Sequence, residues 1–215
     1  MSRKPLKIGV CGVGTVGLAT IDILRDQHET LLARSGQAMV VSHVGARREH
    51  PNHDYGEARV SRDVLDVARD PDVDVLVELI GGTTVALDLI KLAIQQGKHV
   101  VTANKALIAE HGNELIAMAE AAGVQIRYEA AVAGGIPVIK VLRESLAANV
   151  VTEVAGIING TGNFILTEMS TKGRAFDDVL FEAQALGYAE ADPTFDIDGT
   201  DAAHKLVILA SLAFG

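Results

Sequence analysis

Three glycines near the N-terminus constrain the fold more than any other feature of the sequence. The run Gly12-Val-Gly14-Thr-Val-Gly17 follows a β-branched segment, 6–11, and opens a segment of helical periodicity, 15–32. In this context the first glycine allows a tight turn, the second lets the backbone approach a pyrophosphate, and the third lets helix and strand pack closely. Unpaired N–H groups at the helix start would bind phosphate oxygens. The run therefore predicts a dinucleotide-binding turn, with a ligand-free glycine turn as the alternative, and the predicted contacts are Gly12, Val13, Gly14, Thr15, Val16 and Gly17.

Strand-like and helix-like segments alternate from residue 6 to residue 129. The predicted strands are 6–11, 38–45, 73–80, 99–103 and 124–129, and the predicted helices are 15–32, 84–96 and 105–122. Short apolar strands spaced by helices are typical of parallel sheets that are buried on both faces. The pattern therefore predicts an α/β fold, with a Rossmann-type domain over residues 1–135.

The pattern changes near residue 149, where a second domain is expected. The sequence predicts a strand over 150–158, a polar glycine-rich turn over 159–163, and two later helices joined by a loop of Asp and Pro. We assign residues 136–215 to this domain. Because the sequence ends in an apolar helix, 205–215, we expect the domain to be incomplete at its C-terminus.

Composition and charge exclude several classes of protein. The 28 acidic residues against 19 Lys plus Arg give a net charge of −9, which argues against a nucleic-acid partner. The longest uncharged runs, 8–21 and 154–167, are shorter than the roughly 20 apolar residues of a membrane span. Cys11 is the single cysteine, so no internal disulfide can form and a reducing cytoplasm is expected.

The end of the second predicted strand favours NADP(H) over NAD(H). NAD-specific folds of this type place an acid about 20 residues after the glycine run, where it binds the ribose 2′-OH. Here the strand ends in Arg47 and Arg48, and the first acid is Glu49. Arg47, with Arg48, could bind a 2′-phosphate through charge-assisted hydrogen bonds. Two solvated arginines at the start of a loop are the alternative.

Lys105 follows the fourth predicted strand, at the sheet edge where open α/β folds bind their ligands. The helix dipole disfavours a cation at the first position of a helix. An anionic ligand would offset this cost, so Lys105 is a candidate cofactor-binding residue. An ordinary surface lysine explains the position equally well.

The most distinctive run holds five acids followed by a lysine. It contains Glu190, Asp192, Asp196, Asp198, Asp201 and Lys205. Asp201 and Lys205 are four residues apart and share one helix face. Carboxylates can bind a substrate ammonium group, and a neighbouring lysine can donate a proton. Helix capping with a solvated face, or a calcium loop, are the alternatives, although the spacing does not fit an EF-hand.

Five ordered runs together resemble the homoserine dehydrogenase family, and the resemblance covers essentially the whole chain. They are 77–82, 102–105, 129–137, 159–163 and 183–205. The resemblance implies a second domain of α+β type that binds substrate and dimerises. It also implies an NAD(P)H-dependent oxidoreductase that interconverts L-aspartate 4-semialdehyde and L-homoserine in threonine, methionine and isoleucine biosynthesis.

The resemblance further implies a role for individual residues. Lys205 would donate a proton to the carbonyl oxygen, and Lys105 would be a second catalytic lysine beside substrate and cofactor. The implied substrate-binding residues are Glu190, Asp201 and Asp196, and Gly187 would lie by the cofactor.

A sodium ion and a homodimer are also implied. The ion would be bound by Glu129 and by the backbone carbonyls of Val132, Gly134 and Ile136, which are oxygen ligands suited to a hard cation. The family is typically dimeric, so we expect a homodimer in the full-length protein.

Two other functions fit parts of the sequence. Semialdehyde and glyceraldehyde-phosphate dehydrogenases also begin with a Rossmann unit, but they need a thiolate nucleophile. Cys11, the single thiol, lies in the predicted phosphate-binding turn, which makes that chemistry unfavourable. The second alternative is an NADP-binding module without turnover.

Overall fold

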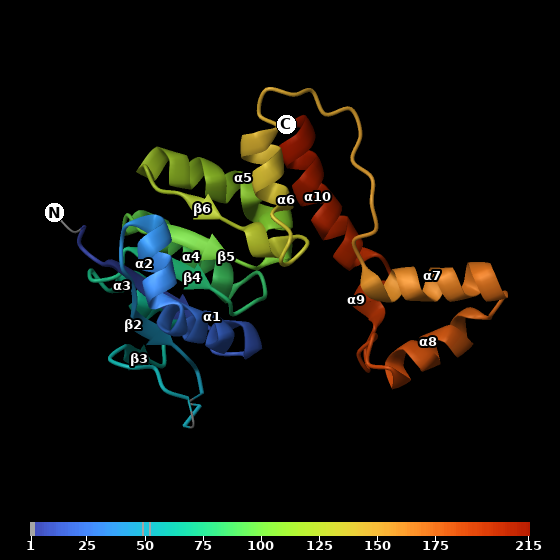
Figure 1. Cartoon of the computed structure of the whole chain (residues 1–215), viewed down its shortest axis with the longest axis horizontal. Coiled ribbons are helices and arrows are strands. Elements are labelled where there is room, and N and C mark those ends of the chain that lie inside the picture. Colours follow the sequence, from blue (N-terminus) through green and yellow to red (C-terminus); the bar gives the residue numbers. More distant parts are fainter. Residues whose placement is uncertain (1–2, 49, 52) are drawn as a thin grey trace. The chain divides into compact units, whose positions relative to one another are not determined.

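The computed structural model describes residues 3–48, 50–51 and 53–215. The chain divides into two compact units, Met1–Ala131 and Val132–Gly215. Figure 1 shows the first unit as a sheet with helices on both of its faces and the second as a set of helices.

A six-stranded parallel sheet forms the centre of the first unit. Its order is β3-β2-β1-β4-β5-β6, which is the order of doubly wound dinucleotide-binding folds. β1 pairs with β2 on one side and with β4 on the other, so the strand order reverses at β1. Such folds bind ligands at this reversal, beyond the carboxyl ends of the strands. The strands are β1 (Leu6–Cys11), β2 (Met39–Gly45), β3 (Arg59–Ser61), β4 (Val75–Glu78), β5 (His99–Thr102) and β6 (Ile126–Arg127).

Helices cover both faces of this sheet. α1 and α2 pack against β2, whereas α3, α4 and α5 lie side by side. Right-handed crossovers place the two groups on opposite faces, because the chain moves in opposite directions from β1 to β2 and from β3 through β6. The helices are α1 (Thr15–Asp26), α2 (His28–Ser35), α3 (Val64–Arg69), α4 (Val85–Gln95) and α5 (Lys105–Ala122), followed by the short helix η1 (Glu129–Ala131).

The core of the first unit consists of aliphatic side chains on each side of the sheet. Val10 and Val44 pack with Ile21 of α1 on one side. Leu89 of α4 and Leu107 of α5 are fully buried. Each such side chain contributes about 1.5–3 kcal/mol when it leaves water. The parallel sheet with helices on both faces confirms the predicted α/β class.

The first unit differs from the sequence prediction in three places. Gln27 has non-helical backbone dihedral angles, so the single helix expected over 15–32 is divided into two helices. None of the eight residues of α2 is buried, so packing does not enforce a straight helix. β3 and α3 were not predicted, because each is too short to show a clear period. The strand expected over 124–129 is shortened to β6, and Glu129 lies in η1 instead.

The second unit contains only helices and loops among its described residues. α6 (Val138–Lys140) continues into the π-helical turn η2 (Val141–Ser145). α7 (Gly160–Lys172) packs against α8 (Phe176–Ala185), with Ile165, Val179 and Ala183 buried between them. The short α9 (Thr194–Ile197) leads into the final helix, α10 (Thr200–Phe214).

Three predictions for the second unit are wrong. Residues 150–158 form no strand: Val150 is 91% exposed, and no other strand in the described part of this unit can pair with them. Residues 159–163 are not a turn, because Asn159 caps α7 and the four residues after it form the first helical turn. The expected pair of helices is a set of four, since α7 begins early and α9 forms within the predicted loop.

A membrane-spanning segment is not among the helices of the described ranges, since none of them combines sufficient length with sufficient apolar character.

Candidate active site

The glycine-rich turn connects β1 to α1 in the geometry that its sequence predicts. Gly12 has a φ of +101°, and a Cβ there would lie 2.5 Å from the carbonyl oxygen of Leu79. A Cβ at Gly17 would lie 1.9 Å from the carbonyl oxygen of Gly12. A Cβ at Gly14 meets nothing within 4 Å, so this position faces open space. The turn therefore packs closely on its inner side and leaves its outer side open to a ligand.

The first turn of α1 offers backbone donors beside this open space. Gly14 is the N-cap and supplies no side-chain hydrogen bond to the helix. Thr15 and Val16 are exposed at the helix start, whereas Val13 is buried. Free helix N–H groups together with the helix dipole favour an anion at this point.

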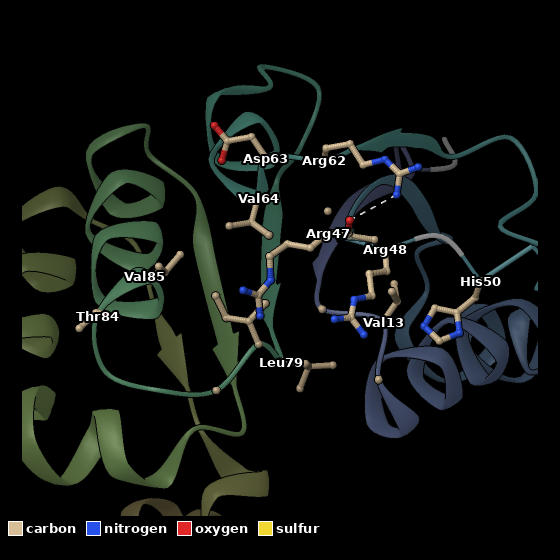
Figure 2. A pocket seen from close by; sticks show the side chains of 16 residues that line it. Val13, Arg47, Arg48, His50, Arg62, Asp63, Val64, Leu79, Thr84 and Val85 are labelled. Atoms are coloured by element: carbon tan, nitrogen blue, oxygen red, sulfur yellow. Dashed lines mark hydrogen bonds between the residues drawn. The ribbon is translucent and has the colours of Figure 1, made fainter.

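A pocket of about 550 Å³ lies between this turn and the ends of β2 and β4 (Figure 2). Arg47, Arg48 and Arg62 all line it, together with His50. Arg62 Nη1 donates to the carbonyl oxygen of Arg47 at 3.5 Å. Three guanidinium groups around one pocket suit a phosphate, because each presents donors in a planar fork.

Arg62 was missed by sequence reasoning, because it follows a strand of only three residues, β3. Asp63 also lines the pocket, but its carboxylate caps α3 by accepting from the Leu65 N–H at 2.9 Å. Glu49, the nearest acid after β2 in sequence, lies outside the described residues.

Lys105 is the first residue of α5 and is half-buried. Asn104 is the N-cap of this helix, and its side chain accepts from the Leu107 N–H at 3.1 Å. The same side chain donates to the carbonyl oxygen of Gly82 at 2.7 Å, in the loop after β4. The lysine thus lies at the carboxyl edge of the sheet, where ligands bind in this fold.

In the second unit, Asp196, Asp201 and Lys205 line one pocket. Lys205 Nζ donates to Asp201 Oδ2 at 2.6 Å and to the carbonyl oxygen of Ile158 at 2.7 Å. Asn159 Nδ2 donates to Asp201 Oδ2 and to Asp196 Oδ1, each at 2.8 Å. Asp201 is 5% exposed, whereas Asn159, Asp196 and Lys205 are half-buried. All four side chains line one pocket of about 610 Å³.

Asn159 is a second residue whose role the sequence did not reveal. The run 159–163 resembles the homoserine dehydrogenase family, but only the fold brings the Asn159 amide between the two carboxylates. The signal for its capping role was an Asn directly before an apolar-periodic segment.

The other acids of this run have different environments. Asp198 accepts from the Thr200 N–H at 2.8 Å, at the start of α10. Hydrogen bonds from Thr194 lower the pKa of the exposed Asp192. These two carboxylates therefore stabilise the turns that precede α9 and α10, one residue before the N-cap positions Pro193 and Gly199. In the described part of the chain, no group of three or more His, Cys, Asp or Glu side chains is placed to hold a metal ion.

Glu190 and Gly187 are not among the residues of the described ranges that line this pocket. Glu190 is exposed in the loop between α8 and α9, and it is absent from the described residues that line the pocket. Gly187 has a φ of +75°, and the Tyr188 N–H returns to the carbonyl oxygen of Ala183 at 2.8 Å. This left-handed position ends α8, which gives Gly187 a structural role of its own.

The four predicted cation ligands fall at the division between the two units. Glu129 is half-buried in η1 of the first unit. Val132, Gly134 and Ile136 lie in the loop that begins the second unit. Ala133 within this loop has a φ of +51°, which is a strained conformation for a residue other than glycine.

Cys11 is unsuited to nucleophilic catalysis. It is fully buried at the end of β1, and burial, together with the charge of Glu78, raises the pKa of its thiol well above its ordinary value. Its Sγ lies 3.8 Å from the carbonyl oxygen of Val64. Since the thiolate is the reactive form, this thiol gives no support to a thioester mechanism.

The parallel sheet, the glycine-rich turn and the pocket beyond it define a dinucleotide-binding protein of the Rossmann class. A family model described as "Homoserine dehydrogenase, NAD binding domain" matches residues 12–129, and one described as "Homoserine dehydrogenase" matches residues 137–215. The chain belongs to the homoserine dehydrogenase family.

Individual relatives agree with this assignment. The chain is 60% identical over 212 residues to a homoserine dehydrogenase of Pseudomonas aeruginosa, with 99% of this chain and 49% of that protein covered. It resembles the crystal structure of a homoserine dehydrogenase from Thiobacillus denitrificans with a TM-score of 0.91 and 54% identity, over 99% of this chain and 49% of that one. It also resembles a hyperthermophilic archaeal homoserine dehydrogenase in complex with NADPH, with a TM-score of 0.84 and 28% identity, over 98% and 70%. The chain spans about half the length of the curated relatives it matches.

Proposed function

We propose that the protein reduces L-aspartate 4-semialdehyde to L-homoserine, reversibly, with a nicotinamide dinucleotide. The observation that carries this proposal is the paired Lys205 and Asp201 in a pocket of the second unit, in a chain whose first unit has a dinucleotide-binding turn. A bound nicotinamide supplies a hydride for the aldehyde carbon.

Lys205 has the donors that this reaction needs. Two of its three N–H groups are engaged by Asp201 and Ile158 in the described part of the chain, which leaves the third for a substrate carbonyl oxygen. The ammonium group stabilises the developing alkoxide and then transfers a proton to it. Asp196 and Asp201 favour the ammonium group of the substrate by their charge, and Glu190 is the third proposed substrate ligand. Lys105 is proposed as the second catalytic lysine, beside the cofactor.

NADP(H) is the preferred cofactor in this proposal. Arg47, Arg48 and Arg62 supply cationic donors at the carboxyl end of β2 and β3, where the ribose of a dinucleotide is bound in this fold. The glycine run 12–17 binds the pyrophosphate, and Gly187 is proposed to contact the same cofactor.

A sodium ion is proposed at Glu129 and the carbonyl oxygens of Val132, Gly134 and Ile136. Support comes from the oxygen-only donor set, which suits a hard cation. Crystals grown with sodium and the cofactor should show an ion among these oxygens. Density for water alone, with hydrogen-bond distances in place of sodium–oxygen distances, would count against the ion.

A homodimer in the cytoplasm is proposed for the full-length protein. Large apolar side chains of the second unit are exposed, among them Val150, Ile157, Leu166 and Phe181. Exposed apolar side chains of this size are suited to the core of an interface between protomers. Light scattering that gives a monomer at all concentrations would overturn the dimer.

Turnover separates this proposal from an NADP-binding module. The module is the second candidate because the chain spans about half the length of its curated relatives. We expect absorbance at 340 nm to fall when the protein, NADPH and aspartate semialdehyde are mixed. Lys205→Ala should lower kcat by about 10²–10⁴-fold, because the proton donor is lost.

Lys140→Ala is the matched control, since Lys140 is an exposed lysine of the same unit, paired with Glu144 at 3.8 Å. It should leave kcat unchanged. Tight NADPH binding with no turnover in the unaltered protein would favour the module.

A further inference from the structure

Glu78 is a buried carboxylate for which the proposed reaction has no direct use. It is the last residue of β4, and its side chain is completely inaccessible to water. A charge in this position is costly unless hydrogen bonds compensate for it. Its sequence signal is a single acid at the end of an otherwise apolar strand.

One carboxylate oxygen of Glu78 holds the loop that lines the nucleotide pocket. Oε1 accepts from the Ile80 N–H at 2.8 Å and from the Gly81 N–H at 3.0 Å. Ile80 and Gly81 both line that pocket, and a Cβ at Gly12 would strike the preceding Leu79. The carboxylate therefore shapes the loop against which the glycine-rich turn packs.

The other oxygen reaches the neighbouring strand. Glu78 and Thr102 are directly paired in the register of β4 and β5, and Thr102 Oγ1 donates to Glu78 Oε2 at 2.6 Å. The same hydroxyl accepts from the Asn104 N–H at 3.0 Å. Thr102 is 1% exposed, so this connection is shielded from water.

Asn104 completes a closed circuit of hydrogen bonds. Its side chain caps α5 and also donates to the carbonyl oxygen of Gly82, in the same loop that Glu78 holds. Lys105 is the next residue. Two separate chain segments, 79–82 and 102–105, are thus tied to one buried carboxylate.

We propose that Glu78, acting through Thr102, is a positioning residue that fixes Lys105 relative to the nucleotide loop. The inference rests on the proposed function of Lys105 and deepens it. A displacement of about 1 Å in a reacting group can cost up to about 10²-fold in rate, so a rigid link of this kind would affect turnover more than binding.

Thr102→Val and Thr102→Ser test the link between the two segments. Valine keeps the shape of threonine and removes the hydroxyl, whereas serine keeps the hydroxyl. We expect Thr102→Val to lower kcat by about tenfold or more while the Kd of NADPH, measured by its fluorescence, stays within about twofold. Thr102→Ser should restore kcat to within about threefold of the original value.

Glu78→Gln tests the nucleotide loop itself. An amide cannot accept from both backbone N–H groups and the Thr102 hydroxyl as the carboxylate does, because half of it is a donor. This variant should weaken NADPH binding as well as turnover, each by about tenfold. Thr20→Val is the matched control, since the Thr20 hydroxyl donates to the carbonyl oxygen of Val16 in its own helix, at 2.8 Å. This variant should change neither quantity.

Acetylation of Lys105, followed by mass spectrometry, gives a readout that needs no substrate. NADPH should protect Lys105 in the unaltered protein and in Thr102→Ser, and protection should fall by about threefold or more in Thr102→Val. Equal kcat and equal protection in Thr102→Val and Thr102→Ser would overturn the proposal. If the unaltered protein does not reduce aspartate semialdehyde, the proposed function fails, whereas NADPH affinity and Lys105 protection still decide the positioning role.

Discussion

His43 is completely buried in β2, and its ring is held from both sides. Nδ1 lies 2.7 Å from Asp70 Oδ2, and Nε2 lies 2.8 Å from Ser61 Oγ. Asp70 ends α3 and Ser61 ends β3, so one ring joins the two elements that the sequence did not predict. Lys98 Nζ also donates to the carbonyl oxygen of Asp70, and burial lowers the pKa of this lysine. At this scale the edge of the sheet depends on a few paired side chains.

Replacing Asp70 by asparagine should change how the free energy of unfolding depends on pH. Burial alone would raise the pKa of Asp70, but hydrogen bonds from the Asp72 N–H and from His43 outweigh it and lower the pKa below its ordinary value of 3.8. The ionised carboxylate therefore stabilises the fold fully above that value, and this contribution is lost as pH falls through the folded pKa. Asp70→Asn should be less stable by about 1–2 kcal/mol at neutral pH, and the difference should shrink below about pH 4.

Urea unfolding at several pH values measures this difference. Asp66→Asn is the control, because Asp66 is exposed and pairs with Arg69 at 3.3 Å; an exposed pair contributes little. A constant gap between Asp70→Asn and the unaltered protein from neutral pH to pH 3 would show that the ionisation of Asp70 is not the cause.

At the scale of elements, α7 links local capping to the candidate substrate pocket. Asn159 Oδ1 accepts from the Gly162 N–H at 2.6 Å, while its Nδ2 donates to Asp196 and Asp201. The helix start and the carboxylates of α9 and α10 thus share one side chain. Any change in how α7 begins is transmitted to the residues that hold Lys205.

Two substitutions of Asn159 should separate capping from the orientation of the acids. Asn159→Ala should lower stability by about 1 kcal/mol through the lost cap and should also lower kcat. Asn159→Ser keeps a capping oxygen but has no amide to bridge the acids, so its thermal stability should be near that of the unaltered protein while kcat falls as far as in Asn159→Ala. Calorimetry and initial rates measure the two effects, and a normal kcat in Asn159→Ser would contradict the bridging role.

The elements that the sequence predicted are those with a local signal. β1, the glycine-rich turn and α5 could be read directly from apolar spacing and from the positions of glycines. β3 and α3 could not, because their positions depend on pairing with β2 and on the buried His43. The strand expected over 150–158 shows the converse error: apolar, β-branched residues suit a strand, but a strand also needs a partner for its backbone.

The candidate site likewise contains residues with a local sequence signal and residues whose roles depend on distant parts of the chain. The spacing of Asp201 and Lys205 was sufficient to predict that they share one helix face. Asp196 was grouped with them only through the resemblance to the family. The roles of Arg62 and Asn159 were not predictable, since each depends on residues distant in sequence.

At the scale of the whole molecule, the local charge at the nucleotide pocket is opposite in sign to the net charge of the protein. The chain has a net charge of −9, yet Arg47, Arg48 and Arg62 gather at one pocket of the first unit. A dinucleotide is an anion, so the general field of the protein opposes its approach, whereas the local arginines attract it. Binding should therefore depend on ionic strength, and most strongly for the cofactor that has the additional phosphate.

Raising ionic strength should weaken NADPH binding more than NADH binding. Between about 20 and 200 mM salt the Debye length falls below about 10 Å, so exposed arginine–phosphate pairs are screened. We expect the Kd of NADPH to rise by about threefold more than that of NADH over this range. The ionic strength is raised with tetramethylammonium chloride while the sodium concentration is held constant, so that occupancy of the proposed sodium site does not change.

Two variants test whether the arginines are the cause. Arg47→Ala should reduce the difference in salt dependence between the two cofactors. Arg34→Ala replaces an exposed arginine in the last turn of α2 and should preserve that difference. Equal salt dependence for the two cofactors would mean that the arginines do not bind the 2′-phosphate, and the proposed preference for NADP(H) would then have no electrostatic basis.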